Sequence, residues 1–220
     1  MSRRLPIYLL LDVSSSMSGE PIAAVQNGVQ TMVAALMDEP QALATAYLSV
    51  ITFSDSAEQL VPLTEVMRFK LPPLKAGGQP CLGEALKLVA KCAEREVVKN
   101  TESEKGDWRP LVFILTGGCA AGDIDQGLAE FKKRKWGSVV VCVAGSGADT
   151  DEFSKITENV VTRDTATSSM LAACFRWISS TVATGSRSAG DEDMDLLTIE
   201  LPPPPEEVEL PPPPEEIRFF

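Results

Sequence analysis

The sequence predicts an α/β fold: a doubly wound, mostly parallel central sheet with one antiparallel edge strand and helices on both faces. Short apolar segments alternate with amphipathic segments along the chain. The apolar segments are continuous rather than alternating, as expected of strands that are buried on both faces. Two strand-like segments, 46–53 and about 58–66, follow each other without a helix between them, so this hairpin supplies the antiparallel edge strand.

The first strand is predicted at 5–11, where an apolar run too short for a buried helix ends at Asp12. A helix is predicted at 20–37, because Ile22, Val25 and Val29 recur at the spacing of one buried face. The remaining strands are predicted at 110–116, 138–144 and 159–162, and the remaining helices at 82–97, 123–135, 149–157 and 168–183. The polar segment 99–109 is predicted to form a surface loop.

Length and charge predict one domain followed by an acidic tail. The 220 residues are enough for one large α/β core. We expect the domain at 1–184, a polar acidic linker at 185–195 and an acidic proline-rich tail at 196–220. From residue 185 onward two basic residues face ten acidic ones, a balance of −8 within the total of −11, which leaves −3 for the domain. This distribution argues against nucleic-acid binding.

The cysteines and the apolar segments bear on the compartment. Five cysteines are scattered without C-x-x-C spacing, which favours buried thiols over a disulfide framework or a zinc site. The first residues do not make a convincing signal peptide, and no apolar run approaches the length of a membrane span. We therefore expect a cytoplasmic protein that has no membrane partner.

Three oxygen-bearing side chains, Asp12, Ser14 and Ser16, follow the first strand directly. In open α/β sheets, ligands bind in the crevice at the carboxyl ends of such strands. One carboxylate and two hydroxyls suit Mg²⁺ or Mn²⁺, which prefer oxygen ligands. The alternative interpretation is that these residues form a turn and cap the next helix.

Several further segments, taken together, resemble the von Willebrand factor A (VWA) superfamily, and most closely the small bacterial VWA proteins associated with tellurium resistance (TerY-like). The segments that carry the resemblance are 4–22, 46–53, 82–86, 109–116 and 175–179. The resemblance implies a Rossmann-like VWA fold and a metal-ion-dependent adhesion site (MIDAS). That site combines D-x-S-x-S with a Thr ahead of an L-G-x-A-L segment and an Asp in a later T-D-G turn.

The sequence departs from this implied site at two positions. Pro80 stands where the Thr is expected, and Gly117 replaces the Asp of the T-D-G turn, so Asp12 is the only remaining motif carboxylate. Affinity for a hard cation rises with ligand charge and geometric fit. We therefore expect a degenerate MIDAS and no resident cofactor. The alternative is a weak Mg²⁺ or Mn²⁺ site that uses Asp12, Ser14 and Ser16 for cation-dependent adhesion.

The sequence gives little support for a catalytic function. The chain has no histidine, which removes Ser-His and Cys-His arrangements, and it has no phosphate-binding P-loop. Neither Cys119 nor Cys81 is followed six residues later by the Arg of a cysteine phosphatase. We predict that the protein is not an enzyme. A nucleotide or anion binder that uses the glycine-rich turn 117–122 stays open as a further alternative.

The tail contains a tandem repeat, E-L-P-P-P-P-E-E-[V/I], at 200–208 and 209–217. Four consecutive prolines favour a polyproline II rod, which loses little entropy on docking. A partner-binding motif and a solvated acidic spacer are both consistent with this composition. The candidate partner-binding residues are Pro202, Pro203, Pro204, Pro205, Pro211, Pro212, Pro213 and Pro214.

These observations lead to one functional hypothesis. We expect a non-enzymatic protein-protein interaction or scaffold module. The TerY-like resemblance implies a bacterial stress-response system with kinase-like or phosphatase-like partners. The one basic cluster, 132–135, follows a predicted helix, where cations interact favourably with the helix dipole, and this reading is favoured over a phosphate-binding patch.

Overall fold

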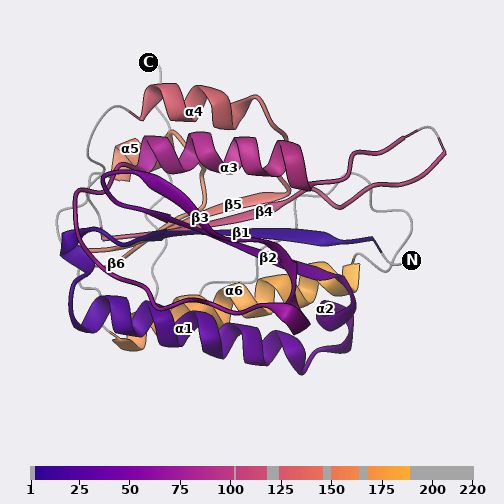
Figure 1. Cartoon of the computed structure of the whole chain (residues 1–220), viewed down its shortest axis with the longest axis horizontal. Coiled ribbons are helices and arrows are strands. Elements are labelled where there is room, and N and C mark those ends of the chain that lie inside the picture. Colours follow the sequence, from indigo (N-terminus) through magenta and orange to yellow (C-terminus); the bar gives the residue numbers. More distant parts are fainter. Residues whose placement is uncertain (1–2, 102, 118–123, 146–149, 164–167, 189–220) are drawn as a thin grey trace, which may run out of the picture.

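The computed structural model describes residues 3–101, 103–117, 124–145, 150–163 and 168–188. A six-stranded sheet in the order β3-β2-β1-β4-β5-β6 forms the centre of the molecule (Figure 1). The pairing of β2 with β3 is antiparallel, and every other pairing is parallel. The strands are β1 Leu5–Asp12, β2 Ala46–Phe53, β3 Ala57–Glu65, β4 Leu111–Thr116, β5 Ser138–Ala144 and β6 Val160–Arg163.

Helices cover both faces of the sheet. Helices α1, α2 and α6 lie over one face, and α3 and α4 lie over the other (Figure 1). The helices are α1 Glu20–Met37, α2 Pro40–Thr45, α3 Leu82–Glu96, α4 Asp125–Lys132, α5 Thr150–Ser154 and α6 Ser168–Ser188. The predicted doubly wound α/β fold, with its antiparallel edge strand, is confirmed. No described helix is both long and apolar enough to cross a membrane.

Strand β1 lies at the centre of the sheet and contributes to both cores. All eight of its residues are buried. Its alternate side chains divide between the two faces: Leu9 and Leu11 join the core under α1 and α6, whereas Tyr8 and Leu10 join the core under α3. Burial on both faces explains why this strand is continuously apolar in the sequence.

Helices α3 and α4 approach each other closely because of a glycine. A Cβ atom at Gly127 would lie 2.0 Å from the carbonyl oxygen of Gly83, so only glycine allows this contact. Beyond α4, the Trp136 ring stacks on Phe131 with a centroid distance of 4.6 Å. The chain must turn back to make this contact. Helix α4 therefore ends at Lys132 and not at the predicted residue 135.

Two further helices differ from the sequence prediction: one was not predicted at all, and one ends later than predicted. Helix α2 was not predicted, because six residues that begin at Pro40 are too few to show a helical period. Helix α6 continues to Ser188, so residues 185–188, which the sequence analysis assigned to the linker, are helical. The rest of the linker and the proline-rich tail lie outside the described residues.

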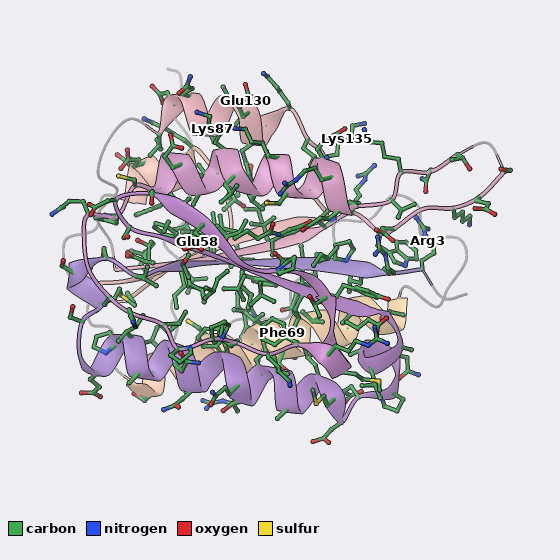
Figure 2. The ribbon with its side chains drawn as sticks, viewed as in Figure 1. Arg3, Glu58, Phe69, Lys87, Glu130 and Lys135 are labelled. Atoms are coloured by element: carbon green, nitrogen blue, oxygen red, sulfur yellow. The ribbon has the colours of Figure 1, made fainter. Side chains whose placement is uncertain are left out.

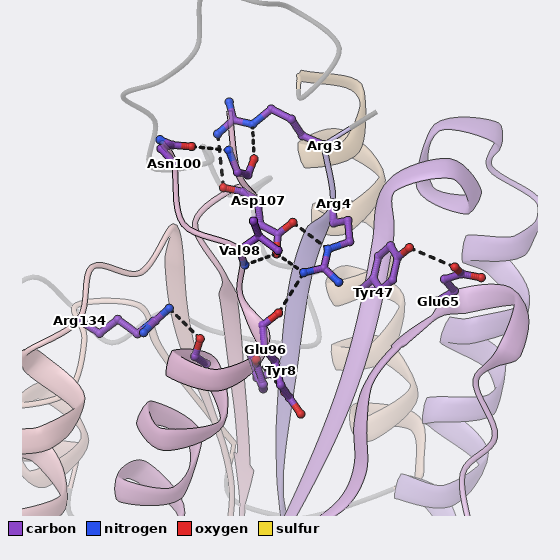
Figure 3. A network of polar contacts seen from close by, with 12 residues as sticks. Arg3, Arg4, Tyr8, Tyr47, Glu65, Glu96, Val98, Asn100, Asp107 and Arg134 are labelled. Atoms are coloured by element: carbon purple, nitrogen blue, oxygen red, sulfur yellow. Dashed lines mark hydrogen bonds and ion pairs between the residues drawn. The ribbon is translucent and has the colours of Figure 1, made fainter. Parts of the chain in front are cut away.

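The segment predicted as a polar surface loop carries a buried ion pair. The Asp107 side chain is only 4% exposed and receives two hydrogen bonds from Arg4, from Nε at 2.8 Å and from Nη2 at 2.5 Å (Figure 3). The backbone N–H of Val98 donates to the same carboxylate at 2.8 Å. The description of 99–109 as wholly surface loop was therefore wrong at Asp107. This pair attaches the segment to the amino ends of β1 and β4.

A second set of hydrogen bonds extends this network into the core. Arg4 also donates to the carbonyl oxygen of Glu96 at the end of α3. The Glu96 carboxylate accepts a hydrogen bond from the hydroxyl of Tyr8 at 3.0 Å and another from the side-chain amide of Gln59. Burial, and then the Glu96 charge, raise the pKa of Tyr8 far above its usual value near 10. The amino edge of the sheet is thus tied together by groups from β1, β3, α3 and the 98–107 segment.

Candidate functional site at the carboxyl edge of the sheet

Asp12 is the last residue of β1 and is fully buried. Its Oδ1 atom accepts a hydrogen bond from the backbone N–H of Ser14 at 2.8 Å. Its Oδ2 atom accepts two, from the Thr116 hydroxyl at 3.0 Å and from the backbone N–H of Gly117 at 2.9 Å. Both oxygens of the only motif carboxylate are therefore engaged by donors from the chain itself.

Ser14 and Ser16 lie beside this carboxylate, in and next to a 3₁₀ turn at Ser15–Met17. Their hydroxyl oxygens are 2.9 Å apart, so one hydroxyl donates to the other. Ser14 is buried and Ser16 is exposed. The alternative interpretation is half correct: these residues do form a turn, in which the Asp12 carboxylate accepts the N–H of Ser14. Their side chains do not cap the next helix, because the N-cap of α1 is Gly19 and neither helical turn has a side-chain cap. The structure thus brings the three predicted site residues together.

The loop that contains Pro80 lies against the D-x-S-x-S loop. The backbone N–H of Gly77 donates to Val13 at 2.7 Å, and the N–H of Ser15 donates to Gly78 at 2.9 Å. Pro80 itself is buried and offers no hydroxyl to the site. Because proline also lacks an N–H, this position supplies neither a ligand oxygen nor a backbone donor.

Asp55 is a carboxylate near this edge that the sequence analysis did not identify. It lies in the turn between β2 and β3, and its Oδ1 atom accepts the backbone N–H of Gln79 at 2.8 Å. A Cβ atom at Gly78, which has a φ of +82°, would lie 2.4 Å from Asp55 Oδ2. Asp55 therefore holds the Pro80 loop in place. No local sequence signal marks it, because the contact joins two turns far apart in the chain.

Gly117 begins the glycine-rich turn after β4. Its N–H already donates to Asp12, so it cannot donate to a bound phosphate without losing that bond. The remaining residues of the turn proposed for anion binding, 118–122, lie outside the described residues. A Cβ atom at Gly117 would lie 2.8 Å from the Ser16 hydroxyl oxygen, so a side chain at this position would point at the predicted metal ligands.

Within the described residues, the predicted metal ligands at this edge include a single carboxylate. Among the described residues, no three His, Cys, Asp or Glu side chains gather where they could hold a metal ion. The described part of the site offers one carboxylate, from Asp12, and three hydroxyls, from Ser14, Ser16 and Thr116, and the carboxylate accepts three hydrogen bonds from the protein. A cation with this shell would gain the charge of one carboxylate only.

The family comparison covers all these positions. Residues 7–119, half of the chain, match the model of the von Willebrand factor type A domain. The chain belongs to the von Willebrand factor type A family. The matched range runs from β1 through Pro80 to just beyond Gly117, so the departures from the metal-binding pattern lie inside the VWA domain.

Solved structures of other VWA proteins share this fold. A von Willebrand factor type A protein from Catenulispora acidiphila has a TM-score of 0.61 at 15% identity, over 83% of this chain and 43% of that one. The pilus adhesin SpaC from Lactobacillus rhamnosus GG has a TM-score of 0.65 at 13% identity, over 83% of this chain and 30% of that one.

Proximal thread matrix protein 1 from the mussel byssus, solved with a zinc-occupied MIDAS motif, has a TM-score of 0.60 at 19% identity, over 83% of this chain and 48% of that one. This chain thus spans less than half the length of each of these three proteins. At such identities the likeness shows the fold alone. A comparison with curated protein sequences finds no match.

The basic cluster 132–135 lies at the carboxyl end of α4, with Lys132 in the last turn and Lys133 at the C-cap, and it also contacts α3. Arg134 donates to the carbonyl oxygen of Ala93 at 2.8 Å, in the last turn of α3, and pairs with Glu94 at 2.7 Å. Lys133 pairs with Glu130 at 2.6 Å. The predicted placement of cations at the carboxyl end of their own helix is thus confirmed for Lys132 and Lys133, and Arg134 adds the same kind of contact at the end of α3.

Proposed function

We propose that this VWA protein is a non-enzymatic protein-interaction module whose contact at the carboxyl edge of the sheet does not depend on a cation. One observation carries the proposal: both oxygens of Asp12 are engaged by protein donors, and Gly117 supplies a backbone N–H where the family pattern has a carboxylate. With Pro80 in place of a hydroxyl residue, partner binding rests on shape and direct hydrogen bonds. The names of the structural neighbours, which include a pilus adhesin and a matrix protein, are consistent with an interaction role.

The wider setting is proposed from the sequence resemblance. The TerY-like segments support a cytoplasmic scaffold in a bacterial stress-response system, with kinase-like or phosphatase-like proteins as partners. The proline runs at 202–205 and 211–214 supply a second contact, because a polyproline rod docks at a low entropic cost. Two near-identical repeats give this contact the option of bivalent binding.

The test is recovery of partners by the tagged full-length protein from its native cytosol. We expect the same partners in excess EDTA and in excess Mg²⁺ or Mn²⁺. Variants with one repeat or no repeat should recover less of the same partners. Loss of all partners in EDTA would contradict a cation-independent contact, and equal recovery by all three lengths would leave the tail as a spacer.

A second candidate, weak cation-dependent adhesion, is favoured by one feature of Asp12. All three of its hydrogen-bond donors are neutral, so within the described part of the chain no cation is bonded to this buried carboxylate. The hydroxyls of Ser14 and Ser16 lie beside it. Titration calorimetry with Mn²⁺ separates the two candidates: stoichiometric binding well below millimolar concentration would favour the adhesion module over the cation-independent one.

A further inference from the structure

A groove of about 580 Å³ lies on the α3–α4 face, away from the MIDAS-like edge. Figure 2 shows Lys87 on α3 and Glu130 on α4 on this face, with Phe69 on the opposite side of the sheet. The groove is lined by five cations, two acids and two apolar residues: Lys87, Lys91, Arg95, Lys133, Arg134, Glu94, Glu130, Leu88 and Ala90. This excess of positive charge occurs on a chain whose net charge is −11.

Three of the cations form a row along α3. Lys87, Lys91 and Arg95 are four residues apart, which places them on one face of the helix. Like charges at this spacing destabilise a helix, so an anionic ligand in the groove would relieve the repulsion. The acids of the groove are engaged by other cations: Glu94 pairs with Lys99 and Arg134, and Glu130 with Lys133.

Acidic side chains neutralise little of the positive charge of this row of three cations. Lys87 lies 3.8 Å from Glu84, and Arg95 contacts only the neutral groups of Gln59 and Cys92. Within the described residues, Lys91 is exposed and forms no salt bridge. The positive field reaches the groove acids as well: the pKa of Glu130 is lowered, chiefly by the Lys133 hydrogen bond and also by the charges of Lys87 and Lys91.

We propose that this groove binds the glutamate pairs of the chain's own tail, Glu206-Glu207 and Glu215-Glu216, within one molecule. Charge complementarity supports this occupant: the segment from residue 185 carries −8, and the groove carries an excess of cations. Each glutamate pair is followed by an apolar residue, Val208 or Ile217. This residue can pack against Leu88 and Ala90, the two apolar residues that line the groove.

The length of the tail permits this contact. Helix α6 ends at Ser188 on the face of the sheet opposite to α3 and α4 (Figure 1). Residues 189–205, 17 in all, separate Ser188 from the first glutamate pair, and such a segment spans up to roughly 60 Å when extended. A sheet with a helix layer on each face is about 30 Å thick, given helix diameters near 10 Å. The tether also keeps the tail at a high effective concentration. The groove therefore competes with any partner for the repeats.

Photo-cross-linking in the full-length protein tests this. Benzoylphenylalanine replaces Val208, and mass spectrometry locates the cross-links. We expect them on α3 and α4 within one molecule, with a reduction of roughly tenfold when Lys91→Glu and Arg95→Glu reverse two groove charges. Lys70→Glu with Lys75→Glu, in the segment whose Leu71 and Leu74 pack on the α1 face, is the matched control and should leave the cross-links unchanged.

A variant of the tail provides an independent test in case the groove variant misfolds. Changing the four glutamates to glutamine leaves the domain untouched and should reduce the same cross-links, as should molar salt, which shortens the screening length to about 3 Å. Cross-links spread evenly over the domain, or insensitive to either set of changes, would overturn the proposal. Cross-links to the groove of a second molecule would overturn binding within one molecule. None of these readouts depends on a partner or a metal, so they are independent of the proposed function.

Discussion

Two buried aspartates lie at opposite ends of the same two strands, β1 and β4, and they are held in different ways. At the amino edge, Asp107 is bound by the guanidinium of Arg4 and by one backbone N–H. At the carboxyl edge, Asp12 is bound by two backbone N–H groups and one hydroxyl, all of them neutral. Among the described residues, a counter-charge binds the aspartate at the amino edge, and only neutral donors bind the one at the carboxyl edge.

This difference separates a structural contact from a site that can still respond to a ligand. The Arg4–Asp107 pair is complete within the chain and attaches the 98–107 segment to the sheet (Figure 3). Both carboxylate oxygens of Asp12 accept hydrogen bonds, but among the described residues all the donors are neutral groups. Asp12 also lies at the edge where α/β sheets bind ligands. Four sets of substitutions test this contrast.

Asp107→Ala should have the largest effect. It removes the carboxylate that pairs with the Arg4 guanidinium, which keeps its hydrogen bond to the Glu96 carbonyl oxygen, and it leaves the Val98 N–H without this acceptor. We expect the free energy of unfolding to fall by about 3 kcal/mol. Urea denaturation measures this loss. Lys133→Ala, which breaks an exposed pair, is the matched control and should cost less than about 0.5 kcal/mol. Similar losses in the two variants would mean that the amino-edge pair is not structurally important.

Asp12→Ala should cost less, about 2 kcal/mol, because it leaves three neutral donors without an acceptor but strands no cation. The same urea measurement applies. Added Mn²⁺ should not change the stability of either Asp12→Ala or the wild type. A loss as large as that of Asp107→Ala would contradict the contrast between the two edges.

Gly117→Asp combined with Pro80→Thr should restore the family's ligand set and raise Mn²⁺ affinity at least tenfold, about 1.4 kcal/mol, through the added carboxylate. The new side chain needs only a small movement of the Ser16 hydroxyl, which lies 2.8 Å from the Cβ position. Calorimetry with Mn²⁺ measures the change. Gly117→Ala with Pro80→Thr controls for side-chain volume. A folded double variant that ignores Mn²⁺ would show that these two positions are not the missing ligands.

Tyr8→Phe should have the smallest effect at neutral pH, about 1 kcal/mol, from the lost hydrogen bond to Glu96. Its main signature is at high pH. Because the folded-state pKa of Tyr8 is raised above its unfolded value near 10, its contribution is fully present below pH 10 and is lost as the pH rises above it. The wild type should therefore lose stability at alkaline pH more steeply than Tyr8→Phe.

Optical titration sharpens this prediction, because the chain has only two tyrosines. The pKa of Tyr47 is also raised, by burial and by its hydrogen bond to Glu65. Neither phenol should ionise near pH 10 while the protein is folded. A phenol that titrates normally in the wild type and is lost in Tyr8→Phe would contradict the buried hydrogen bond to Glu96.

The sequence alone determined the architecture, because strand and helix signals are local. Strands 46–53 and 138–144 and helix 20–37 have the predicted ends, since continuous apolar runs and a 3.6-residue period follow directly from burial on two faces or on one. The D-x-S-x-S positions were also predictable, since they follow a buried strand. Local signals failed where a distant contact sets the end of an element, as at α4, where Trp136 stacks back on Phe131.

Only the tertiary structure decided which group each aspartate side chain binds. Asp12, Asp55 and Asp107 have the same side chain but different partners. Asp12 accepts hydrogen bonds from neutral donors at the carboxyl end of β4, Asp55 holds a neighbouring loop, and Asp107 pairs with Arg4. Each of these contacts joins residues that lie far apart in the chain, and a hydrogen bond acts only over about 3 Å. The sequence therefore determined which side chains end each strand, and the packing of the strands determined what those side chains bind.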